Sequence, residues 1–292
     1  MKLSDSLSEK TEIIRDGNFS SMGTVFSHYP QQIIYVVREC DVRKVIGNSF
    51  ISCVITTPSL VSKLPDKIGI ASTQDPQHVF YALQSMLSQH PEFVLQPFDN
   101  QISPSAKIHP SAVISATSVV IGRDVVIEKN VIVNEQTIID EGCIIRSNSI
   151  IGNTSLPPGS VMNGPKIQPS GGVHLHREVD IHANTCLHRA IFKGYTEIGQ
   201  QTKIDNLDIV GQGTTIGKRC LICAGVTIGE SVIIGDDAWI GPNTTLENQI
   251  TIGKNVYITI GSTITHDIDD DKVVKDNYAI DRKRFKKVIR GM

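Results

Sequence analysis

The sequence has no long apolar run, no block of like charge and no dense set of cysteines. Residues 1–10 lack the apolar segment of a secretory leader, and no stretch approaches the roughly 18 apolar residues of a membrane span. We therefore expect a cytoplasmic protein without a membrane span. A net charge of −2 without a strongly basic or acidic block argues against nucleic acid and against a membrane surface as binding partners.

Six cysteines are scattered over 292 residues, a chain much larger than the secreted domains that depend on disulfides. Reduced thiols are therefore expected. Cys220 and Cys223 form a CxxC pair, but the sequence has no second CxxC to complete a zinc site. We expect neither redox chemistry nor metal binding from this pair.

The main feature of the sequence is a repeat of six residues from Ile198 to Ile264. An aliphatic residue occupies every sixth position: Ile198, Ile204, Val210, Ile216, Ile222, Ile228, Ile234, Ile240, Leu246, Ile252, Ile258 and Ile264. Two positions earlier lies a column of mostly small residues: Thr196, Thr202, Thr214, Cys220, Val226, Val232, Ala238 and Thr244. A period of six is typical of a parallel β-helix built from hexapeptides. Residues two apart on a strand share a face, so each hexapeptide points one large and one small side chain inward.

The same spacing starts earlier in the chain, in a column of Ile102, Ile108, Ile114, Val120, Val126, Ile132, Ile138, Ile144 and Ile150. A stretch rich in glycine and proline, residues 153–172, then interrupts the repeat, and a second break follows around residues 192–195. Long ordered loops on solenoids are often functional. We therefore expect the active cleft near these two loops, which lie within about two coils of each other.

Residues 1–98 show no six-residue period. Apolar runs at 32–37 and 50–55 indicate buried strands, and Asp75 followed by Pro76 indicates the start of a helix. We predict a small α/β domain over 1–98, a β-helix over 99–268 with an inserted loop near 153–172, and a C-terminal tail over 269–292.

Two segments, 181–190 and 203–207, resemble motifs of the nucleotide-sugar N-acyltransferases, and 107–114 resembles the family's entry into its β-helix. The resemblance covers nearly the whole chain. It implies a mainly β protein: a left-handed parallel β-helix preceded by a small α/β nucleotide-binding domain, assembled as a homotrimer. The implied reaction moves an acyl group from a thioester, carried by coenzyme A or acyl carrier protein, to the amino group of a nucleotide-linked amino sugar, without a bound cofactor.

The chain departs from this family at the catalytic position. Gln212 stands where the family has its general-base histidine, and a glutamine cannot accept a proton near neutral pH. Glu230 replaces a family glycine 18 residues later, about one coil or roughly 5 Å away. His188 replaces a family aspartate. Glu230 and His188 are candidate replacement bases, although a solvated corner glutamate and a surface histidine are the alternatives.

Five further residues are candidates for substrate binding. Tyr35 can stack on a nucleotide base or belong to the core of its domain. The family motifs suggest four others: Arg189, Asp205, Asn206 and Gln249, the last at the position of a second family histidine.

Other interpretations remain open at this point. The lipid A enzyme UDP-3-O-acylglucosamine N-acyltransferase is one alternative, and a non-catalytic binding paralogue is another. A trimeric zinc enzyme is the third, because His176, His182 and His188 lie six residues apart. Since neighbouring hexapeptides lie on different faces of a triangular prism, these histidines diverge, and we expect no metal site within one chain.

Asp208 is unusual because it falls in the column of small inward residues. An unpaired buried carboxylate is costly. We expect it to have a hydrogen-bonding partner or to distort its strand.

Overall fold

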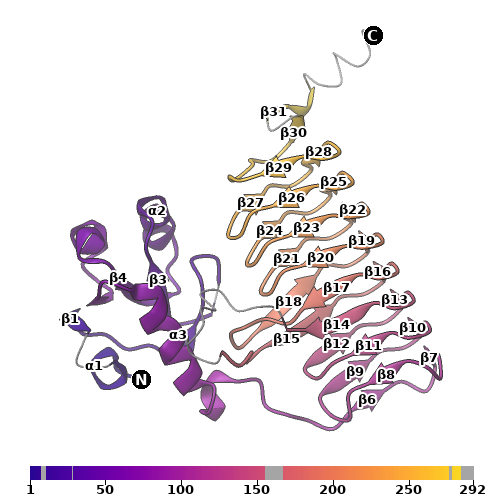
Figure 1. Cartoon of the computed structure of the whole chain (residues 1–292), viewed down its shortest axis with the longest axis horizontal. Coiled ribbons are helices and arrows are strands. Elements are labelled where there is room, and N and C mark those ends of the chain that lie inside the picture. The colour runs from indigo at the N-terminus through magenta and orange to yellow at the C-terminus, as the bar shows by residue number, and fades with distance from the viewer. Residues whose placement is uncertain (8–10, 28, 155–166, 276–277, 284–292) are drawn as a thin grey trace. The chain divides into compact units, whose positions relative to one another are not determined.

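The computed structural model describes residues 1–7, 11–27, 29–154, 167–275 and 278–283 (Figure 1). The chain forms two compact units. The first combines Met1–Gln96 with Leu156–Ser170 and Ile191–Lys193, and the second comprises Pro97–Ser155, Gly171–Ala190 and Gly194–Met292.

The N-terminal segment of the first unit ends at residue 96, close to residue 98, where the predicted α/β domain ends. Most of the predicted inserted loop, residues 155–166, lies outside the described residues. None of the helices in the described ranges has the length and apolar character needed to cross a membrane.

The first unit is built on a five-stranded sheet of order β1-β5-β4-β3-β2, in which only β1 runs antiparallel to its neighbour. Its strands are β1 (Glu12–Arg15), β2 (Ser21–Met22), β3 (Gln32–Val36), β4 (Ile51–Thr56) and β5 (Gly69–Ser72). Its helices are α1 (Leu3–Ser6), α2 (Glu39–Gly47) and α3 (Pro76–Leu87), with the 3₁₀ turns η1 (Pro58–Lys63) and η2 (Pro91–Phe93).

The alternation of side chains along β3 creates two cores. Ile33 packs in a cluster with Phe80 of α3, whereas its neighbour Ile34 packs in another cluster with Val42 of α2. Successive side chains of a strand point to opposite faces, so α2 and α3 cover opposite faces of the sheet. This arrangement confirms the predicted α/β region.

The α3 helix starts where the sequence predicts. The Asp75 side chain accepts a hydrogen bond from the His78 backbone N–H at 3.0 Å, and Pro76 occupies the first helical position. The cap satisfies one of the backbone donors that a helix leaves free, and proline has no N–H to satisfy there.

The second unit is a left-handed parallel β-helix whose short strands stack into three sheets, which we name the first, second and third faces (Figure 1). The first face contains β6 (Gln101–Ile102), β9 (Val119–Ile121), β12 (Thr137–Ile139), β15 (Gly172–Leu175), β18 (Tyr195–Ile198), β21 (Thr215–Ile216), β24 (Ile233–Ile234) and β27 (Thr251–Ile252). The second contains β7 (Lys107–Ile108), β10 (Val126–Ile127), β13 (Ile144–Ile145), β16 (Asp180–Ile181), β19 (Lys203–Ile204), β22 (Leu221–Ile222), β25 (Trp239–Ile240), β28 (Tyr257–Ile258), β30 (Lys272–Lys275) and β31 (Tyr278–Asp281). The third contains β8 (Val113–Ile114), β11 (Ile132–Val133), β14 (Ile150–Asn153), β17 (Cys186–His188), β20 (Ile209–Val210), β23 (Thr227–Ile228), β26 (Thr245–Leu246) and β29 (Thr263–Ile264).

Each strand lies beside the strand one coil later, as in the pairs Val210 with Ile228 and Ile222 with Ile240. The first and third faces have eight strands each, which corresponds to eight coils and agrees with the period of 18 residues. Every large residue of the column from 198 to 264 is 0–2% exposed. The small column is buried as well, so the predicted inward pattern is confirmed for this part of the helix.

The prediction was wrong for the earlier column beyond Ile114. Ile108 pairs with Ile127 and Ile114 with Val133, so the inward column shifts by one position between residues 114 and 121. The inward large residues are therefore Ile121, Ile127, Val133, Ile139, Ile145 and Ile151. One corner contains an extra residue, and because both neighbouring positions are aliphatic the periodicity did not reveal it.

From residue 198 onward, the corners between strands adopt a left-handed backbone conformation once in every hexapeptide. Positive φ angles occur at a spacing of six in residues 201, 207, 213, 219, 225, 231, 237, 243, 249, 255 and 261. Among residues with a side chain, Asn and Asp adopt this conformation most readily. This preference explains the asparagines and aspartates at corners such as Asn243 and Asp237.

The predicted separate tail, 269–292, is partly a continuation of the β-helix unit. Strand β30 pairs in parallel with β28, and β31 returns antiparallel to β30. Val274 is buried in the same hydrophobic core as the coils, which explains why this segment continues the sheet.

Asp208 belongs to a ladder of inward side-chain oxygens that accept hydrogen bonds from the next coil. Its Oδ1 accepts from Val226 N–H at 2.7 Å, as Thr202 Oγ1 accepts from Cys220 N–H at 3.0 Å and Thr214 Oγ1 from Val232 N–H at 3.3 Å. Burial raises the pKa of Asp208 to about 8. The predicted partner therefore exists, and the folded protein holds this carboxyl in its neutral form at pH 7.

Replacing Asp208 by threonine should stabilise the protein at neutral and alkaline pH. The folded pKa of about 8 exceeds the ordinary value of 3.8, so the stability contributed by the proton is fully present below pH 4 and is lost as pH rises to 8. The gain in unfolding free energy of Asp208→Thr should grow by up to about 1.4 kcal/mol per pH unit across this window. Denaturant unfolding at pH 5, 6, 7 and 8 measures it.

The control for this prediction is Asp269→Thr, which changes an exposed aspartate on the same unit. A gain that is equal at all four pH values, or that also appears in Asp269→Thr, would contradict a neutral buried Asp208.

Candidate functional site

The two interruptions of the repeat leave from the same corner of the β-helix. We call the turn that follows each third-face strand the third corner. Residues 156–170 lie between β14 and β15, and residues 191–193 lie between β17 and β18, which places both departures at third corners of successive coils. The points at which the two segments leave the β-helix, after β14 and after β17, therefore lie on successive coils.

Gln212 and Glu230 lie at the third corners of the next two coils, each two residues beyond its strand. The Gln212 carbonyl accepts a hydrogen bond from Ser231 N–H at 2.9 Å, and the Gln212 side chain forms a hydrogen bond with the Glu230 carboxyl. Gln212 is buried, with 4% of its surface exposed, and Glu230 is half-buried. The predicted stacking of these two residues is therefore present.

Glycine precedes each member of this pair for a steric reason. A Cβ on Gly211 would lie 2.4 Å from the carbonyl oxygen of Gly229, so the two coils approach too closely for any side chain there. This close approach positions Gln212 and Glu230 next to each other.

Burial raises the pKa of Glu230 to about 7, while the hydrogen bond from Gln212 opposes part of that rise. A carboxyl with this pKa is present in both protonation states near neutral pH. It can therefore accept a proton from one group and return it to another, which an exposed glutamate does less efficiently.

The backbone amide of Glu230 already has a partner. Its N–H donates to Asn248 Oδ1 at 2.8 Å, and Asn248 occupies the equivalent corner one coil later. The sequence reasoning did not identify Asn248, which accepts this hydrogen bond.

His188 ends β17, one coil before Gln212 at the same edge of the third face. It is half-buried, and desolvation lowers the pKa of its imidazole, which favours the neutral ring. The next residue, Arg189, is buried: its Nε donates to Gly171 O and its Nη1 to Glu135 Oε1, both at 2.9 Å. Arg189 therefore holds the chain where it re-enters the β-helix.

Asp205 and Asn206 lie at a different corner, the one that follows the second face. Asp205 Oδ1 accepts hydrogen bonds from the backbone and side-chain nitrogens of Asn206 at 2.8 and 2.7 Å. Asn206 Oδ1 accepts from Ala183 N–H at 3.1 Å, which links this corner to the preceding coil. The third face separates these residues from Gln212 within one chain.

The remaining predicted site residues lie on separate elements. Gln249 adopts a positive φ of 58° at a third corner, and its N–H donates to Glu230 O at 2.8 Å. Tyr35 belongs to the first unit, where its ring lies 5.1 Å from that of Phe80 and 5.9 Å from that of Tyr81. Tyr35 is therefore part of an aromatic cluster and is only partly buried.

The three histidines at six-residue spacing diverge as expected. His176 follows a first-face strand, His182 follows a second-face strand and His188 ends a third-face strand.

Comparison with known proteins identifies the repeat. Residues 118–153 and 231–266 match the model of the bacterial transferase hexapeptide (six repeats), and residues 209–230 match the hexapeptide repeat of succinyl-transferase. These segments, about a third of the chain, show that it contains hexapeptide repeats of the kind found in bacterial transferases. No curated protein sequence matches it significantly.

Several solved structures resemble this hexapeptide-repeat protein at low identity. The UDP-N-acetylglucosamine acyltransferase of Campylobacter jejuni matches 63% of this chain and 82% of its own at 19% identity, with a TM-score of 0.47. The enzyme of the same name from Bacteroides fragilis matches 66% and 78% at 19% identity, with a TM-score of 0.46. The acetyltransferase domain of PglB from Neisseria gonorrhoeae matches 85% and 98% at 13% identity, with a TM-score of 0.22. Similarities this distant carry no information about the substrate.

The hydrogen bond between Gln212 and Glu230 can be tested by titration. Gln212→Met keeps water out but removes the donor that stabilises the carboxylate, so the pKa of Glu230 should rise further above its value of about 7. A ¹³C NMR titration of protein labelled at the glutamate carboxyl carbons measures it. The resonance missing in Glu230→Gln identifies the signal, and an unchanged or lower pKa in Gln212→Met would show that the hydrogen bond is not made.

Proposed function

We propose that this hexapeptide-repeat protein is an N-acyltransferase that moves an acyl group from a thioester to the amino group of a nucleotide-linked amino sugar, with Glu230 as general base. The observation that supports this proposal most is the Glu230 carboxyl, whose pKa is about 7 and whose side chain is hydrogen-bonded to Gln212 at the corner from which both inserted segments depart. The motifs at 181–190 and 203–207 support the choice of substrate class.

The reaction needs a neutral amine, a carbonyl and a group that accepts one proton. The amine nitrogen attacks the thioester carbon, the C–N bond forms and the C–S bond breaks. The deprotonated Glu230 takes the proton from the nitrogen and returns it to the departing sulfur. Gln212 has no acidic or basic form near neutral pH, so its role is to orient Glu230.

A base contributes only part of the acceleration, because polarisation of the carbonyl contributes strongly as well. The Glu230 N–H is engaged by Asn248 Oδ1 at 2.8 Å, so this amide becomes available to a developing oxyanion only if Asn248 turns away. Neutral His188, one coil before Gln212, is the next donor at the same corner.

The proposal includes a homotrimer. Asp205 and Asn206 lie at the corner on the other edge of the third face from Gln212, so one chain does not bring the two groups together. A groove between neighbouring subunits would pair the third corner of one chain with Asp205 and Asn206 of the next. Coenzyme A or acyl carrier protein is the proposed thioester carrier.

The proposed base can be tested by activity against pH. Acetyl-CoA incubated with a panel of dTDP- and UDP-linked amino sugars should release free thiol, with kcat/KM falling below pH 7 as Glu230 is protonated. Glu230→Gln should lower the rate by about 10²–10⁴ and remove this pH dependence. Glu247, an exposed glutamate at the same corner of the next coil, provides the matched control. Glu247→Gln should keep both the wild-type rate and its pH dependence.

Two results would reject this assignment. If no amino sugar releases thiol from the wild-type protein, the transferase proposal fails. If Gln212→His raises the rate by about 10²–10⁴, the natural protein lacks an efficient base and Glu230 does not fill that role.

The homotrimer is a separate prediction. Outward β-branched residues line the third face, including Val113 at 59% and Ile209 at 43% exposure, and packing of chains against one another would bury them. Light scattering of purified protein should give three times the 31.9 kDa of one chain. A monomeric mass at micromolar concentration would contradict the prediction, and Ile209→Glu should weaken the assembly whereas Thr215→Glu on the first face should not.

A further inference from the structure

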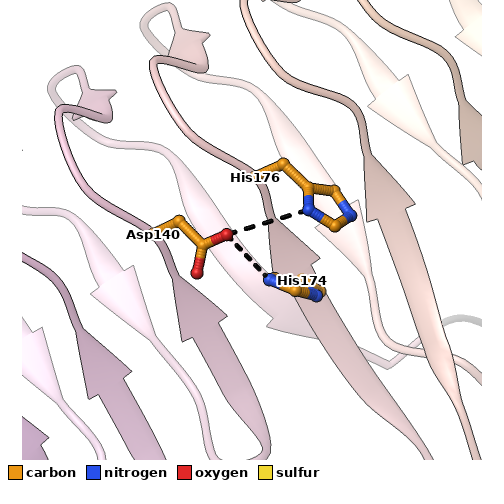
Figure 2. Close-up of side chains that lie close together, drawn as sticks. All are labelled: Asp140, His174 and His176. Carbon is orange, nitrogen blue, oxygen red and sulfur yellow. Dashed lines mark hydrogen bonds and ion pairs between the residues drawn. The ribbon is translucent and has the colours of Figure 1, made fainter.

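A second cluster of reactive side chains lies on the first face. Asp140 follows β12, His174 lies within β15 and His176 follows β15 (Figure 2). The two strands pair in parallel, with Ile138 beside His174 and Ile139 beside Leu175. Residues two apart on a strand share a face, so His174 and His176 both project outward, next to Asp140.

The three side chains converge on one point. Asp140 Oδ2 lies 3.2 Å from His174 Nε2 and 3.7 Å from His176 Nδ1, and dashed lines mark these two contacts in Figure 2. One ligand atom from each residue lies within 4.8 Å of the others. Tetrahedral zinc, with bonds near 2.0–2.2 Å, places its ligand atoms roughly 3.3–3.5 Å apart. Small side-chain rotations would therefore suffice to close these three residues around such an ion.

A fourth residue occupies the place of an outer-shell partner. Glu197, in β18 directly beside His174, has its Oε2 3.5 Å from His176 Nε2. A metal-binding histidine usually donates its second ring N–H to a carboxylate, which fixes the tautomer and the ring orientation. The Nδ1 of His176 thus faces Asp140, and its Nε2 faces the carboxylate of Glu197.

The backbone under the cluster is held firmly. His176 N–H donates to Ile198 O and Asp140 N–H donates to Leu175 O, both at 2.9 Å. The rings of His174 and His176 lie 4.1 Å apart at an angle of 35°. The ligand positions are therefore fixed by the ladder that defines the β-helix.

We propose that Asp140, His174 and His176 bind a divalent transition metal of the zinc class, with Glu197 orienting His176. Two imidazoles and one carboxylate suit zinc, and three protein ligands leave one coordination position open to water. The side chains are 33%, 22% and 36% exposed, so an ion can reach the site from solvent. The site differs from the divergent set His176, His182 and His188, and the proposal goes beyond our expectation of no metal site within one chain.

Zinc titration of the full chain, expressed without a polyhistidine tag and stripped with a chelator, tests this proposal. Isothermal calorimetry should show one Zn²⁺ per chain. His174→Ala and His176→Ala should each lower the affinity at least 100-fold, and Glu197→Gln should lower it about 10–100-fold, as expected for an outer-shell partner. Circular dichroism of the metal-free variants should match the wild type, which separates loss of ligand from loss of fold.

The matched control is His182→Ala. His182 is 33% exposed and lies 3.6 Å from both Asp180 and Asp205, so it is also a half-buried histidine between two carboxylates. Among the residues that the structure describes, it forms no metal-binding group with a second histidine. The control should keep the wild-type affinity. The proposal is overturned if the wild-type chain binds no zinc, or if His182→Ala weakens binding as much as His174→Ala does.

Discussion

The vertical register of the coils is the constraint on which the rest of the structure depends. Parallel pairing places each residue of a coil about 4.8 Å from the residue 18 positions later. Corner side chains therefore contact the side chain 18 residues later, on the next coil. Arg219 forms an ion pair with Asp237 at 2.7 Å, and Arg123 forms one with Glu141 at 2.7 Å. The Gln212 and Glu230 contact is another member of this class, but its partial burial gives it a different chemical outcome.

The same register decides which polar groups the interior accepts. An inward oxygen is tolerated where it can receive a backbone N–H of the next coil, as in Thr202 and Thr214. Asp208 obeys this rule with Oδ1, whereas its Oδ2 has no hydrogen-bonding partner among the described residues. The cost of that second oxygen is what keeps the carboxyl protonated.

The sequence predicts neighbours correctly where each coil has 18 residues, and it fails where a coil contains extra residues. Glu230 was found by counting 18 from Gln212, because no insertion intervenes. The inward column from residue 121 to residue 151 was misplaced by one position, because valine or isoleucine occupies both neighbouring positions. Asp140 and His176 were not associated, because the segment between β14 and β15 changes their separation to 36 residues. His174 and His176 are two residues apart, a spacing that places both side chains on the same face of a strand, and this was the signal available in the sequence.

In the proposed mechanism, a stacked corner supplies the proton acceptor that the resembled family takes from a histidine. A histidine is a base on its own, because the unperturbed pKa of an imidazole already lies near neutrality, and it needs no partner on the next coil. A glutamate reaches the same range only by losing water, and desolvation alone favours its neutral form. The hydrogen bond from Gln212 counters that effect, so the pKa of about 7 results from two opposed contributions on adjacent coils. Parallel pairing sets the distance between these coils, and the absence of a Cβ at Gly211 avoids a clash with the Gly229 carbonyl oxygen, so the acid–base property of Glu230 depends on backbone packing.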